Sequence, residues 1–534
     1  MEIRYKEDAK LTRLSVRPGQ AVAAGDALFE VEAGKATETV TAPAAGTVGQ
    51  IFCKEGKDIT PSTVILTLEE AAAEAAPAPE TPQGESETIE CDIAVLGGGP
   101  GGYVAAIYAA KRGKKVVVIE KAKLGGTCLN VGCIPTKSLV KSSEILVDAL
   151  NADKFGIHVE GAAPDMEKII AHKDAVVAEL VRGVDFLMRK NGITVVRGAG
   201  AFLDALSLYV PEENKTVKAR DVIIATGSTF KESAMEGLDL PFVMNSTQAL
   251  ASTELPRSVT ILGGSVTGLE FACLYHNLGA KVHVLKATAS MHGGVDDDVS
   301  DELIRLLRAR GIEITLNTQM KRVQAADGGQ ALVTYALDGV DHVIVSDRVI
   351  NALGRRPLTE GIGLEKIGVA LNEKKKAVVV DSHMRTNVPH VYAIGDVTAI
   401  NMLAHVASRQ GVVAVDNILG EEKEMDYSAV PAVIFTSPEV ASVGATESDL
   451  RRRGVKYTAS RFAFAGNGKA MSQESRDGYV KLLRNDESGK IVGGQIIGPD
   501  ASTLIDTLAL VVTNRLDEAA ITGTIFPHPT TGTS

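Results

Sequence analysis

Hydrophobic and polar residues follow a repeated pattern over the first 70 residues of the chain. Residues 18–32 and 55–69 match each other at a constant offset of 37 positions. Each copy reads as a glycine turn followed by alternating apolar and polar residues, the period of a strand with one buried face. The repeat predicts two similar sheets packed on each other, with Gly34-Lys35-Ala36 at the tip of a hairpin between the copies.

The pattern changes after residue 70. Residues 71–88, AAAEAAPAPETPQGESET, contain no large apolar residue and three prolines, so they are predicted to form a semi-rigid linker. From residue 89 onward, short apolar strands alternate with helical stretches, which is typical of doubly wound α/β domains. After Ser428, four strand-like segments favour a terminal α+β domain: VPAVIFTS, KYTASRFAF, YVKLLRN and KIVGGQIIG.

Composition narrows the class of protein. A chain of 534 residues is too long for one hydrophobic core, so several domains are expected. A net charge of -11 argues against a nucleic-acid or anionic-membrane surface and favours small-molecule or protein partners. The N-terminus lacks the apolar core of a signal peptide, and the chain lacks an apolar run of about 18 residues. We therefore expect a soluble, cytoplasmic protein.

Five cysteines in so long a chain do not make a disulfide scaffold. In a reducing compartment, the closely spaced pair Cys128 and Cys133 is expected to be redox-catalytic rather than structural. Five residues along a regular helix advance about 7.5 Å, beyond the usual Cα separation of about 4.4–6.8 Å in a disulfide. If the two cysteines pair, the segment must be distorted, and Gly132 and Pro135 are the candidate sources. A helix starting after them would point its amides toward Cys133 and stabilise a thiolate.

A dinucleotide-binding turn is predicted near residue 100. The apolar strand CDIAVL is followed by the turn GGGPGG and a helix, and the next strand ends in Glu120. Strand, glycine turn, helix, strand and acid in this order form the dinucleotide fingerprint. Gly97 permits the turn, Gly99 lets backbone amides approach a pyrophosphate, and Gly102 lets helix and strand pack. Glu120 would accept hydrogen bonds from ribose hydroxyls.

Residues 125–137, GGTCLNVGCIPTK, closely resemble the redox motif of the pyridine nucleotide-disulfide oxidoreductases, and within them that of dihydrolipoamide dehydrogenase. The resemblance runs from about residue 93 to the C-terminus and implies FAD, NAD and a homodimer. It also implies oxidation of protein-bound dihydrolipoamide, with hydride passed to NAD⁺. Cys128 would be the interchange thiol that attacks the substrate disulfide, and Cys133 the thiol next to the flavin. Lys137 would lie near the flavin ring, paired with Glu270.

Three further segments carry the same resemblance. TNVPHVYAIGD matches the family's second flavin segment, whose Asp396 would bind the ribityl chain of FAD. ATGS matches the segment that returns the chain between the two nucleotide domains, and it implies cofactor contacts by Thr226 and Gly227. NALGRRP resembles the segment that closes the second nucleotide domain, and Gly354 lies within it.

The second nucleotide site departs from the fingerprint. Gly263, Gly264 and Gly268 lie in the turn GGSVTG, but the middle glycine is replaced by Ser265, whose side chain should hinder the pyrophosphate. The next strand ends in Lys286, where an acid is expected. A lysine cannot accept hydrogen bonds from ribose hydroxyls and would favour a phosphate. Three interpretations stay open: weak NAD binding, a preference for NADP, or no productive nicotinamide binding.

The C-terminal segment PHPT resembles the family's His-Pro-Thr segment. Its histidine, here His528, would take the proton of the interchange thiol across a dimer interface. The carboxylate that orients this histidine should stand five positions later, where the chain has Thr533, and the family's terminal helix is missing. Loss of the orienting acid in an analogous triad lowers the rate about 10⁴-fold. One expectation is therefore that the chain is a truncated copy of an active enzyme.

The N-terminal repeat resembles a lipoyl domain, in which a lysine at the hairpin tip, here Lys35, carries the lipoyl group. The family usually has Asp before this lysine and here has Gly34, which leaves recognition by the attaching enzyme open. Biotinyl domains share the fold but flank their lysine with methionines, which are absent here. The implied partner is a lipoylated acyltransferase or carrier protein of a 2-oxo acid dehydrogenase, acetoin dehydrogenase or glycine cleavage complex.

The predicted fold is α/β: two Rossmann-like dinucleotide-binding domains and an α+β dimerisation domain, preceded by a small all-β lipoyl-like domain. Expected boundaries are 1–70 for the lipoyl-like domain, 71–88 for the linker, 89–232 for the FAD-binding domain, 233–358 for the NAD-binding domain, 359–428 for a central FAD-contacting segment and 429–534 for the dimerisation domain. The expected function is dihydrolipoyl dehydrogenase. The alternative is a catalytically impaired lipoyl-bearing flavoprotein that acts as carrier or assembly component. Mercuric reductases need a C-terminal cysteine pair, and the last cysteine here is Cys273.

Overall fold

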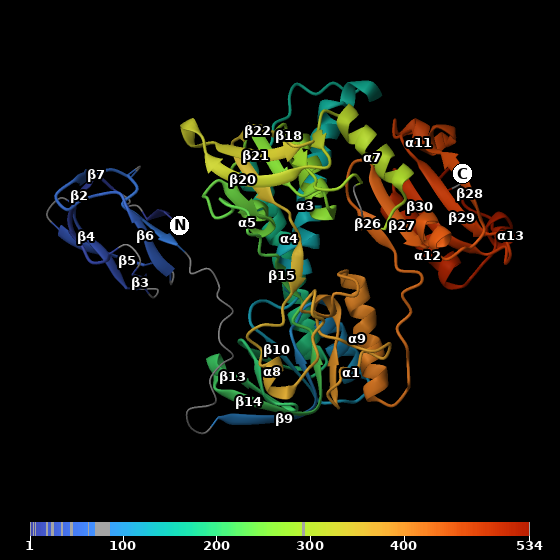
Figure 1. The fold of residues 1–534 in the computed structure, drawn as a ribbon, viewed down its shortest axis with the longest axis horizontal. Coiled ribbons are helices and arrows are strands. Elements are labelled where there is room, and N and C mark those ends of the chain that lie inside the picture. Colours follow the sequence, from blue (N-terminus) through green and yellow to red (C-terminus); the bar gives the residue numbers. More distant parts are fainter. Residues whose placement is uncertain are drawn as a thin grey trace. The chain divides into compact units, whose positions relative to one another are not determined.

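The computed structural model divides into two compact units, Met1–Ala78 and Pro79–Ser534, each of which is described by itself (Figure 1). The residues that the structure describes are 2–3, 5, 7–17, 20–22, 26–33, 36–42, 46–61, 63–69, 86–290 and 294–532. Gly34, Lys35, Thr533 and residues 71–85 of the predicted linker lie outside them.

The first unit consists of two four-stranded antiparallel sheets, with strand orders β1-β8-β6-β3 and β5-β4-β2-β7. The strands are β1 Glu2–Ile3, β2 Ala9–Leu14, β3 Ala21–Val22, β4 Ala27–Ala33, β5 Ala36–Thr41, β6 Gly46–Ile51, β7 Asp58–Ile59 and β8 Leu66–Glu69. When 37 is added to the residue numbers, β1 falls within β5, β2 coincides with β6, β3 coincides with β7 and β4 overlaps β8. Each strand of one sheet therefore corresponds to the strand at the same place in the other sheet, which confirms the predicted pair of similar sheets.

The core of this unit repeats in the same way. Leu28 and Phe29 are fully buried, and so are Ile65 and Leu66, which lie 37 positions later. The two copies therefore contribute matching apolar side chains to one shared interior, which is why neither copy needs a core of its own.

The second unit begins with a mixed sheet of order β11-β10-β9-β14-β13-β12, in which β25 also pairs with β14. Its elements are β9 Glu87–Leu96, α1 Pro100–Lys111, β10 Val116–Glu120, α2 Gly126–Val131, α3 Cys133–Leu150, α4 Met166–Lys190, β11 Thr194–Arg197, β12 Ala201–Asp204, β13 Ser207–Val210, β14 Lys215–Ile224, β25 Val391–Ala393 and α9 Ala404–Ile418. Strand β9 starts at Glu87, inside the range predicted as linker, because it pairs with the start of β14. Helices α1 and α9 approach so closely that a Cβ on Gly411 would lie 2.8 Å from the Gly101 carbonyl.

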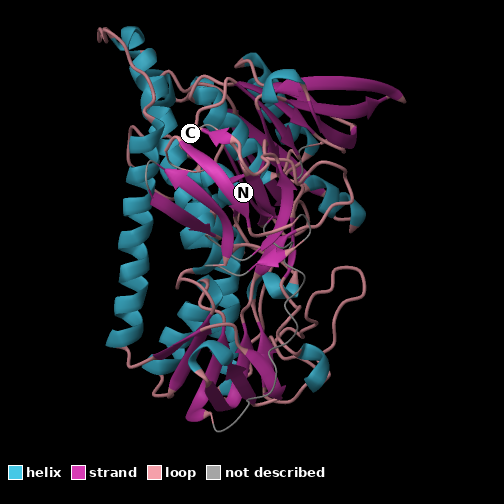
Figure 2. Cartoon of the chain, turned by 90° about the vertical axis from the view of Figure 1, so that its left-hand side faces the viewer, coloured by secondary structure: helices cyan, strands magenta, loops and turns pink. Residues whose placement is uncertain are grey.

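A second parallel sheet, of order β16-β23-β17-β18-β19, is inserted between these parts of the chain. It contains β16 Val243–Asn245, α5 Ser246–Ala251, β17 Ser258–Leu262, α6 Val266–Asn277, β18 Lys281–Leu285, α7 Asp297–Ala309, β19 Glu313–Thr315 and β23 Arg348–Asn351, with a meander of β20 Gln319–Ala325, β21 Ala331–Leu337 and β22 Val340–Ser346. Two short strands, β15 Ser228–Phe230 and β24 Arg355–Pro357, pair antiparallel where the chain passes between the sheets. The two Rossmann-like domains are thereby confirmed, with helices beside their strands (Figure 2).

The C-terminal domain is an antiparallel sheet of order β26-β27-β30-β29-β28, with helix α12 Ala501–Thr513 packed on β27 and β30. Its other elements are β26 Ala432–Ile434, β27 Glu439–Gly444, α10 Glu447–Arg452, β28 Tyr457–Ala463, α11 Gly468–Ser472, β29 Tyr479–Asn485, β30 Ile491–Gly498 and α13 Glu518–Thr522. Four of the strands coincide with the predicted segments, and β27 was not predicted. Among the residues described, no helix is long and apolar enough to cross a bilayer.

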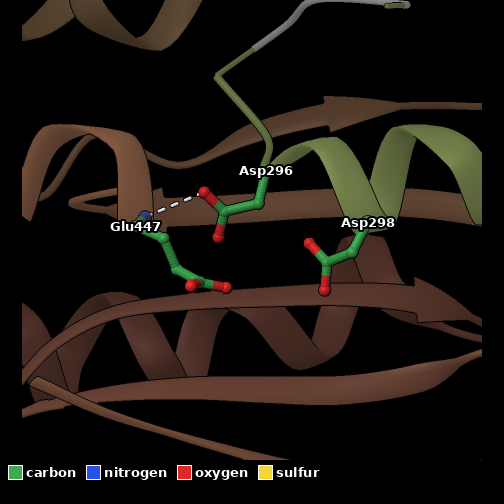
Figure 3. A group of neighbouring side chains, drawn as sticks. All are labelled: Asp296, Asp298 and Glu447. Carbon is green, nitrogen blue, oxygen red and sulfur yellow. Dashed lines mark hydrogen bonds between the residues drawn. The ribbon is translucent and has the colours of Figure 1, made fainter. Parts of the chain in front are cut away.

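A fully buried lysine joins the second nucleotide domain to the C-terminal domain. Lys481 of β29 has no exposed side-chain surface, and its Nζ donates to Asp296 Oδ2 at 2.8 Å, to Asp298 Oδ1 at 2.9 Å and to Glu447. Figure 3 shows the three carboxylates converging from the start of α7 and from α10. Their spacing would suit a metal ion, but the positive charge between them is supplied by the lysine.

Burial opposes the charge of Lys481, but the hydrogen bonds to the three carboxylates outweigh it, so the pKa of the lysine is raised. Gln495 Nε2 also donates to Asp296 Oδ2 at 2.7 Å, which satisfies the buried carboxylate further. A buried ion that keeps all its partners is tolerated, whereas one that loses them is costly.

We expect Lys481→Met to destabilise the protein by about 3–5 kcal/mol, because it leaves buried carboxylates without a counter-charge. The matched control is Lys490→Met, which removes an exposed ion pair with Asp517 at 3.0 Å and should change the stability by less than about 1 kcal/mol. Thermal unfolding of the two variants and of the unaltered protein measures both effects. Equal midpoints for the two variants would contradict the prediction.

Candidate redox and dinucleotide-binding site

Cys128 and Cys133 form a disulfide across a break between two helices. Helix α2 ends at Val131 and α3 starts at Cys133, and Gly132 between them has φ −142° and ψ −110°. The break brings the two Cα atoms to 4.7 Å, well below the separation that a continuous helix would impose. The distortion expected from the sequence is therefore present.

Gly132, and not Pro135, produces the break. A Cβ on Gly132 would lie 2.9 Å from the Thr127 carbonyl oxygen, so the close approach requires glycine. Pro135 is buried in the first turn of α3, where a backbone N–H has no partner within the helix and its loss costs little. Of the two candidate sources of the distortion, Gly132 lies at the break, whereas Pro135 lies inside α3.

The redox segment packs directly on the first glycine-rich turn. The Gly125 N–H donates to the Gly98 carbonyl at 2.8 Å, and a Cβ on Gly126 would lie 2.7 Å from the Gly99 Cα. Cys133 is exposed at the N-terminus of the 18-residue helix α3. The amides of that first turn favour a negative charge on its sulfur once the disulfide opens.

Two of the turn's glycines are required by packing, and a third is not. A Cβ on Gly97, whose φ is +114°, would lie 2.2 Å from the Ala225 carbonyl oxygen, and one on Gly102 would lie 1.9 Å from the Gly97 carbonyl oxygen. A Cβ on Gly99, in contrast, would meet its nearest neighbour at 3.8 Å. Gly99 begins α1, so the open space lies at a helix N-terminus suited to a phosphate group.

Glu120 lies beside this turn and is hydrogen-bonded to it. Its buried carboxylate accepts from the Gly98 N–H and from the Ala122 N–H, each at 2.7 Å. It thus presents acceptor atoms beside the turn, where a ribose would bind.

A partly buried arginine links the expected second flavin segment to the redox segment. Ser228 Oγ donates to Asp396 Oδ2 at 2.6 Å, and Arg355 Nε donates to the same Ser228 Oγ at 2.8 Å. Arg355 Nη2 also donates to the Ser228 carbonyl at 2.7 Å and reaches Thr127 Oγ1 at 3.5 Å. Burial lowers the pKa of Arg355, and the nearby Asp396 carboxylate partly offsets that effect.

The sequence did not single out Arg355 and Ser228, although both lie in motifs that it identified. Thr226, which it did single out, donates through Oγ1 to the Leu358 carbonyl at 2.7 Å, and Gly227 adopts φ +76° beside it. Gly354 has φ +118°, and its carbonyl accepts from the Lys231 N–H at 3.0 Å. All these residues lie where the chain crosses between the nucleotide domains.

The structure pairs Lys137 with Glu270. Lys137 Nζ donates to both carboxylate oxygens at 2.9 and 3.0 Å and lies 4.2 Å from the centre of the Phe435 ring. Lys137 is one turn beyond Cys133 on α3, and the nearly fully buried Glu270 belongs to α6. The ion pair therefore connects the redox helix to the second nucleotide domain.

The second glycine-rich turn repeats the packing of the first. A Cβ on Gly263, whose φ is +109°, would lie 2.4 Å from the Ala352 carbonyl oxygen, and one on Gly268 would lie 1.9 Å from the Gly263 carbonyl oxygen. Gly264 lies between them. Ser265 begins α6 with an ordinary φ of −86°, and its Oγ lies 3.5 Å from the Ala352 carbonyl oxygen, to which it donates. Lys286, after β18, is half-buried, and burial lowers its pKa.

His528 is exposed in a segment that two polar contacts anchor to the C-terminal domain. Buried Asn467 donates through Nδ2 to the Thr530 carbonyl at 3.1 Å, and Thr531 Oγ1 donates to Asp500 Oδ2 at 3.0 Å. Within the described part of a single chain, no hydrogen bond joins His528 to the redox pair. The predicted contribution of this histidine across a dimer interface stays a prediction.

Fold and site together define a disulfide oxidoreductase with two dinucleotide sites. The chain belongs to the pyridine nucleotide-disulphide oxidoreductases, whose family model matches residues 91–411 and whose dimerisation-domain model matches residues 430–534. This family uses FAD and NAD(H). Residues 3–68 match the biotin-requiring enzyme model, which covers biotinyl and lipoyl domains, and the chain carries such a lipoyl domain.

Similar proteins fall into the same family. The chain is 41% identical over 447 residues to the dihydrolipoyl dehydrogenase of Chlamydia muridarum, covering 82% of this chain and 94% of the relative. It is 40% identical over 453 residues to that of Bacillus subtilis, covering 83% and 94%. Among solved structures it is similar to LpdA from Mycobacterium tuberculosis, with TM-score 0.77 and 28% identity over 83% of this chain and 97% of that one. The HOCl-induced flavoprotein disulfide reductase RclA from Escherichia coli gives TM-score 0.74 and 27% identity over the same shares.

The residues at the first turn fit FAD. Gly99 leaves room at a helix N-terminus, Glu120 offers acceptors beside it, and the Asp396 carboxylate accepts from the Ser228 hydroxyl, which Arg355 holds in turn. These groups would hold the pyrophosphate, the ribose and a polar chain of the cofactor respectively.

We expect Arg355→Met to raise the FAD dissociation constant about ten- to hundredfold, because Ser228 Oγ, which donates to the Asp396 carboxylate, loses the charge-assisted hydrogen bond from Arg355 that orients it. The control is Arg356→Met at the next position, where the guanidinium faces Glu232 and Glu360 at the surface. Titration of the apoprotein with FAD, followed by quenching of flavin fluorescence, compares the two. A larger effect at Arg356 would refute the assignment.

Proposed function

We propose that the protein is a dihydrolipoyl dehydrogenase, which oxidises protein-bound dihydrolipoamide to lipoamide and passes the electrons through FAD to a nicotinamide nucleotide, NAD⁺ in the family. The observation that carries the proposal is the Cys128–Cys133 disulfide, held against the first dinucleotide turn at the N-terminus of α3. The identity of about 40% to proteins of that name over four-fifths of the chain supports it.

The redox pair performs a thiol–disulfide exchange in this proposal. One substrate thiolate attacks the Cys128 sulfur, forms a mixed disulfide and releases Cys133 as a thiolate, which the amides of α3 stabilise. The second substrate thiolate then attacks the substrate sulfur of the mixed disulfide, which releases lipoamide and leaves Cys128 reduced. Bound FAD would accept the electron pair from the reduced cysteines and deliver it to the nicotinamide.

Other residues hold groups and protons in place. His528 of the partner subunit takes the proton that the substrate thiol gives up, which requires a homodimer through the C-terminal domain. The Lys137–Glu270 ion pair lies one turn beyond Cys133 on α3, where the lysine would be near the flavin ring. The FAD site in this proposal consists of Gly97, Gly99, Gly102, Glu120, Thr226, Gly227 and Asp396. The nicotinamide-nucleotide site consists of Gly263, Gly264, Gly268, Lys286 and Gly354.

The N-terminal unit supplies substrate in this proposal. A lipoyl group on Lys35, tethered through the Pro/Ala/Glu-rich segment, would reach a millimolar local concentration at an active site within its range. The unit serves as carrier for this enzyme in the cytoplasm, alongside the acyltransferase or carrier protein of a 2-oxo acid dehydrogenase, acetoin dehydrogenase or glycine cleavage complex.

A second candidate is a lipoyl-bearing flavoprotein that acts as a carrier without turnover. Ser265 in the second glycine-rich turn and Lys286 after β18 favour it, because the first domain has Gly99 and Glu120 at the equivalent positions. Anaerobic titration of the FAD-loaded protein with dihydrolipoamide separates the two candidates. A long-wavelength thiolate–flavin absorbance band supports the enzyme, and no band with any donor supports the carrier.

We expect Cys128→Ser to lower the rate of dihydrolipoamide oxidation at least a thousandfold, because a serine hydroxyl cannot form the mixed disulfide. Cys91→Ser is the matched control, since this buried thiol lies in strand β9 and takes no part in the exchange. Steady-state turnover with dihydrolipoamide measures both variants. Turnover that survives the loss of Cys128 would refute the proposed chemistry.

The attachment site gives a separate prediction. Intact mass measurement of protein produced with lipoic acid in the medium should show one lipoyl increment, which Lys35→Arg removes and Lys57→Arg retains. Retention of the increment in Lys35→Arg would place the group elsewhere, and its absence from the unaltered protein would show that Gly34 prevents attachment.

A further inference from the structure

The two nucleotide domains place Glu120 and Lys286 at equivalent positions. In the first domain Leu96 pairs with Ile119, and the Gly97 N–H donates to the Ile119 carbonyl at 2.8 Å. In the second domain Leu262 pairs with Leu285, and the Gly263 N–H donates to the Leu285 carbonyl at 2.9 Å. Glu120 and Lys286 are the residues that directly follow Ile119 and Leu285 in the two domains.

The equivalent side chains have opposite hydrogen-bonding chemistry. Glu120 accepts from the Gly98 N–H at 2.7 Å and presents an anionic acceptor where ribose hydroxyls bind. Lys286 carries three donors and no acceptor, so it offers nothing to the Gly264 N–H, the counterpart of Gly98. The second site thus has an ammonium and a backbone amide where the first has a carboxylate.

The charge of Lys286 is not neutralised by the protein. Within the described ranges, no ion pair includes Lys286, and burial alone is responsible for its lowered pKa. Lys281, at the start of the same strand, differs in both respects: it is exposed and pairs with Glu313 at 3.2 Å. A half-buried ammonium without a carboxylate interacts more strongly with an anionic ligand than a screened surface charge does.

Ser265 acts on a different part of the ligand. Its φ of −86° is ordinary, so the side chain places no strain on the backbone of the turn. It stands where the first site has Gly99, the glycine that protein packing does not require. The side chain therefore weakens binding of the pyrophosphate, which every dinucleotide shares, and cannot discriminate between nucleotides that differ at the ribose.

We propose that Lys286 and the Gly264 amide form a subsite for a ribose 2′-phosphate, so that the second dinucleotide site binds NADP(H) in preference to NAD(H). This inference rests on the proposed function, because it concerns the nucleotide that accepts the electrons. It distinguishes this chain from the NAD(H) use of its family.

The test measures binding of fragments that lack the nicotinamide. The FAD-loaded full-length protein is titrated by calorimetry with 2′,5′-ADP and with 5′-AMP, so that no redox step is needed. We expect 2′,5′-ADP to bind about ten- to hundredfold more tightly, the range of a charge-assisted contact. Lys286→Glu should abolish or reverse this ratio, whereas Lys281→Glu, the same charge change on the same strand, should leave it intact.

Two further variants serve as controls for this experiment. Lys286→Met keeps the apolar stem without the charge, and it should bring the two fragments to near parity if Lys286→Glu does not fold. Ser265→Gly should strengthen binding of NADH and NADPH by a similar factor and leave their ratio unchanged. Equal affinities of the unaltered protein for the two fragments, or a ratio unaffected by Lys286→Met, would overturn the inference.

The outcome can be separated from that of the proposed function. Anaerobic reduction of the flavin by dihydrolipoamide requires only the redox pair and FAD. If the dithiol reduces the flavin but the protein shows no preference for the 2′-phosphate, the proposed function stands and this inference is refuted. If the protein shows the preference but the dithiol does not reduce the flavin, this inference stands and the proposed function is refuted.

Discussion

The close approach of the redox segment to the first glycine-rich turn is the contact on which the site depends. A Cβ on Gly126 would lie 2.7 Å from the Gly99 Cα, so the position of Gly126 has no room for a larger residue. This approach, together with the break at Gly132, sets the disulfide beside the dinucleotide turn and begins a long helix at Cys133. Helix α3 then places Lys137 beside Glu270, and this ion pair fixes the second domain against the redox segment.

A comparison of the two nucleotide domains separates the residues of a binding turn that the fold requires from those that the ligand requires. The glycines that contact backbone are kept in both turns, with nearly the same φ values and the same short approach to a carbonyl oxygen. The positions that differ are Ser265, which corresponds to the less crowded Gly99, and Lys286, which corresponds to Glu120. A fold can therefore be preserved in full while the chemistry that it offers to a ligand changes.

Local patterns in the sequence predicted much of this structure. The internal repeat, the glycine turns and four strand-like segments of the C-terminal domain are signals within short windows, and each corresponds to an observed element. Strand β27, EVASVG, was not predicted because alanine, serine and glycine have weak strand propensity, and it forms through its neighbours β26 and β30.

The contacts that local reasoning could not find join distant parts of the chain. Lys481 occupies a core-facing position of its strand, on the same face as Leu483, and only the carboxylates of α7 and α10 make that position tolerable. Arg355 meets Ser228 across 127 residues of sequence. In both cases the partners are brought together by tertiary structure, and neither has a spacing that a sequence window would reveal.

The order of the chain also has a consequence for biosynthesis. All five strands of the second sheet lie between residues 243 and 351, whereas the first sheet is completed by β25 at Val391–Ala393 and covered by α9 at Ala404–Ile418. A ribosome therefore releases the whole inner domain before the outer one has its last strand and helix. Of the two nucleotide domains, the one that begins first is therefore completed second, and until then the face of α1 that receives α9 is uncovered.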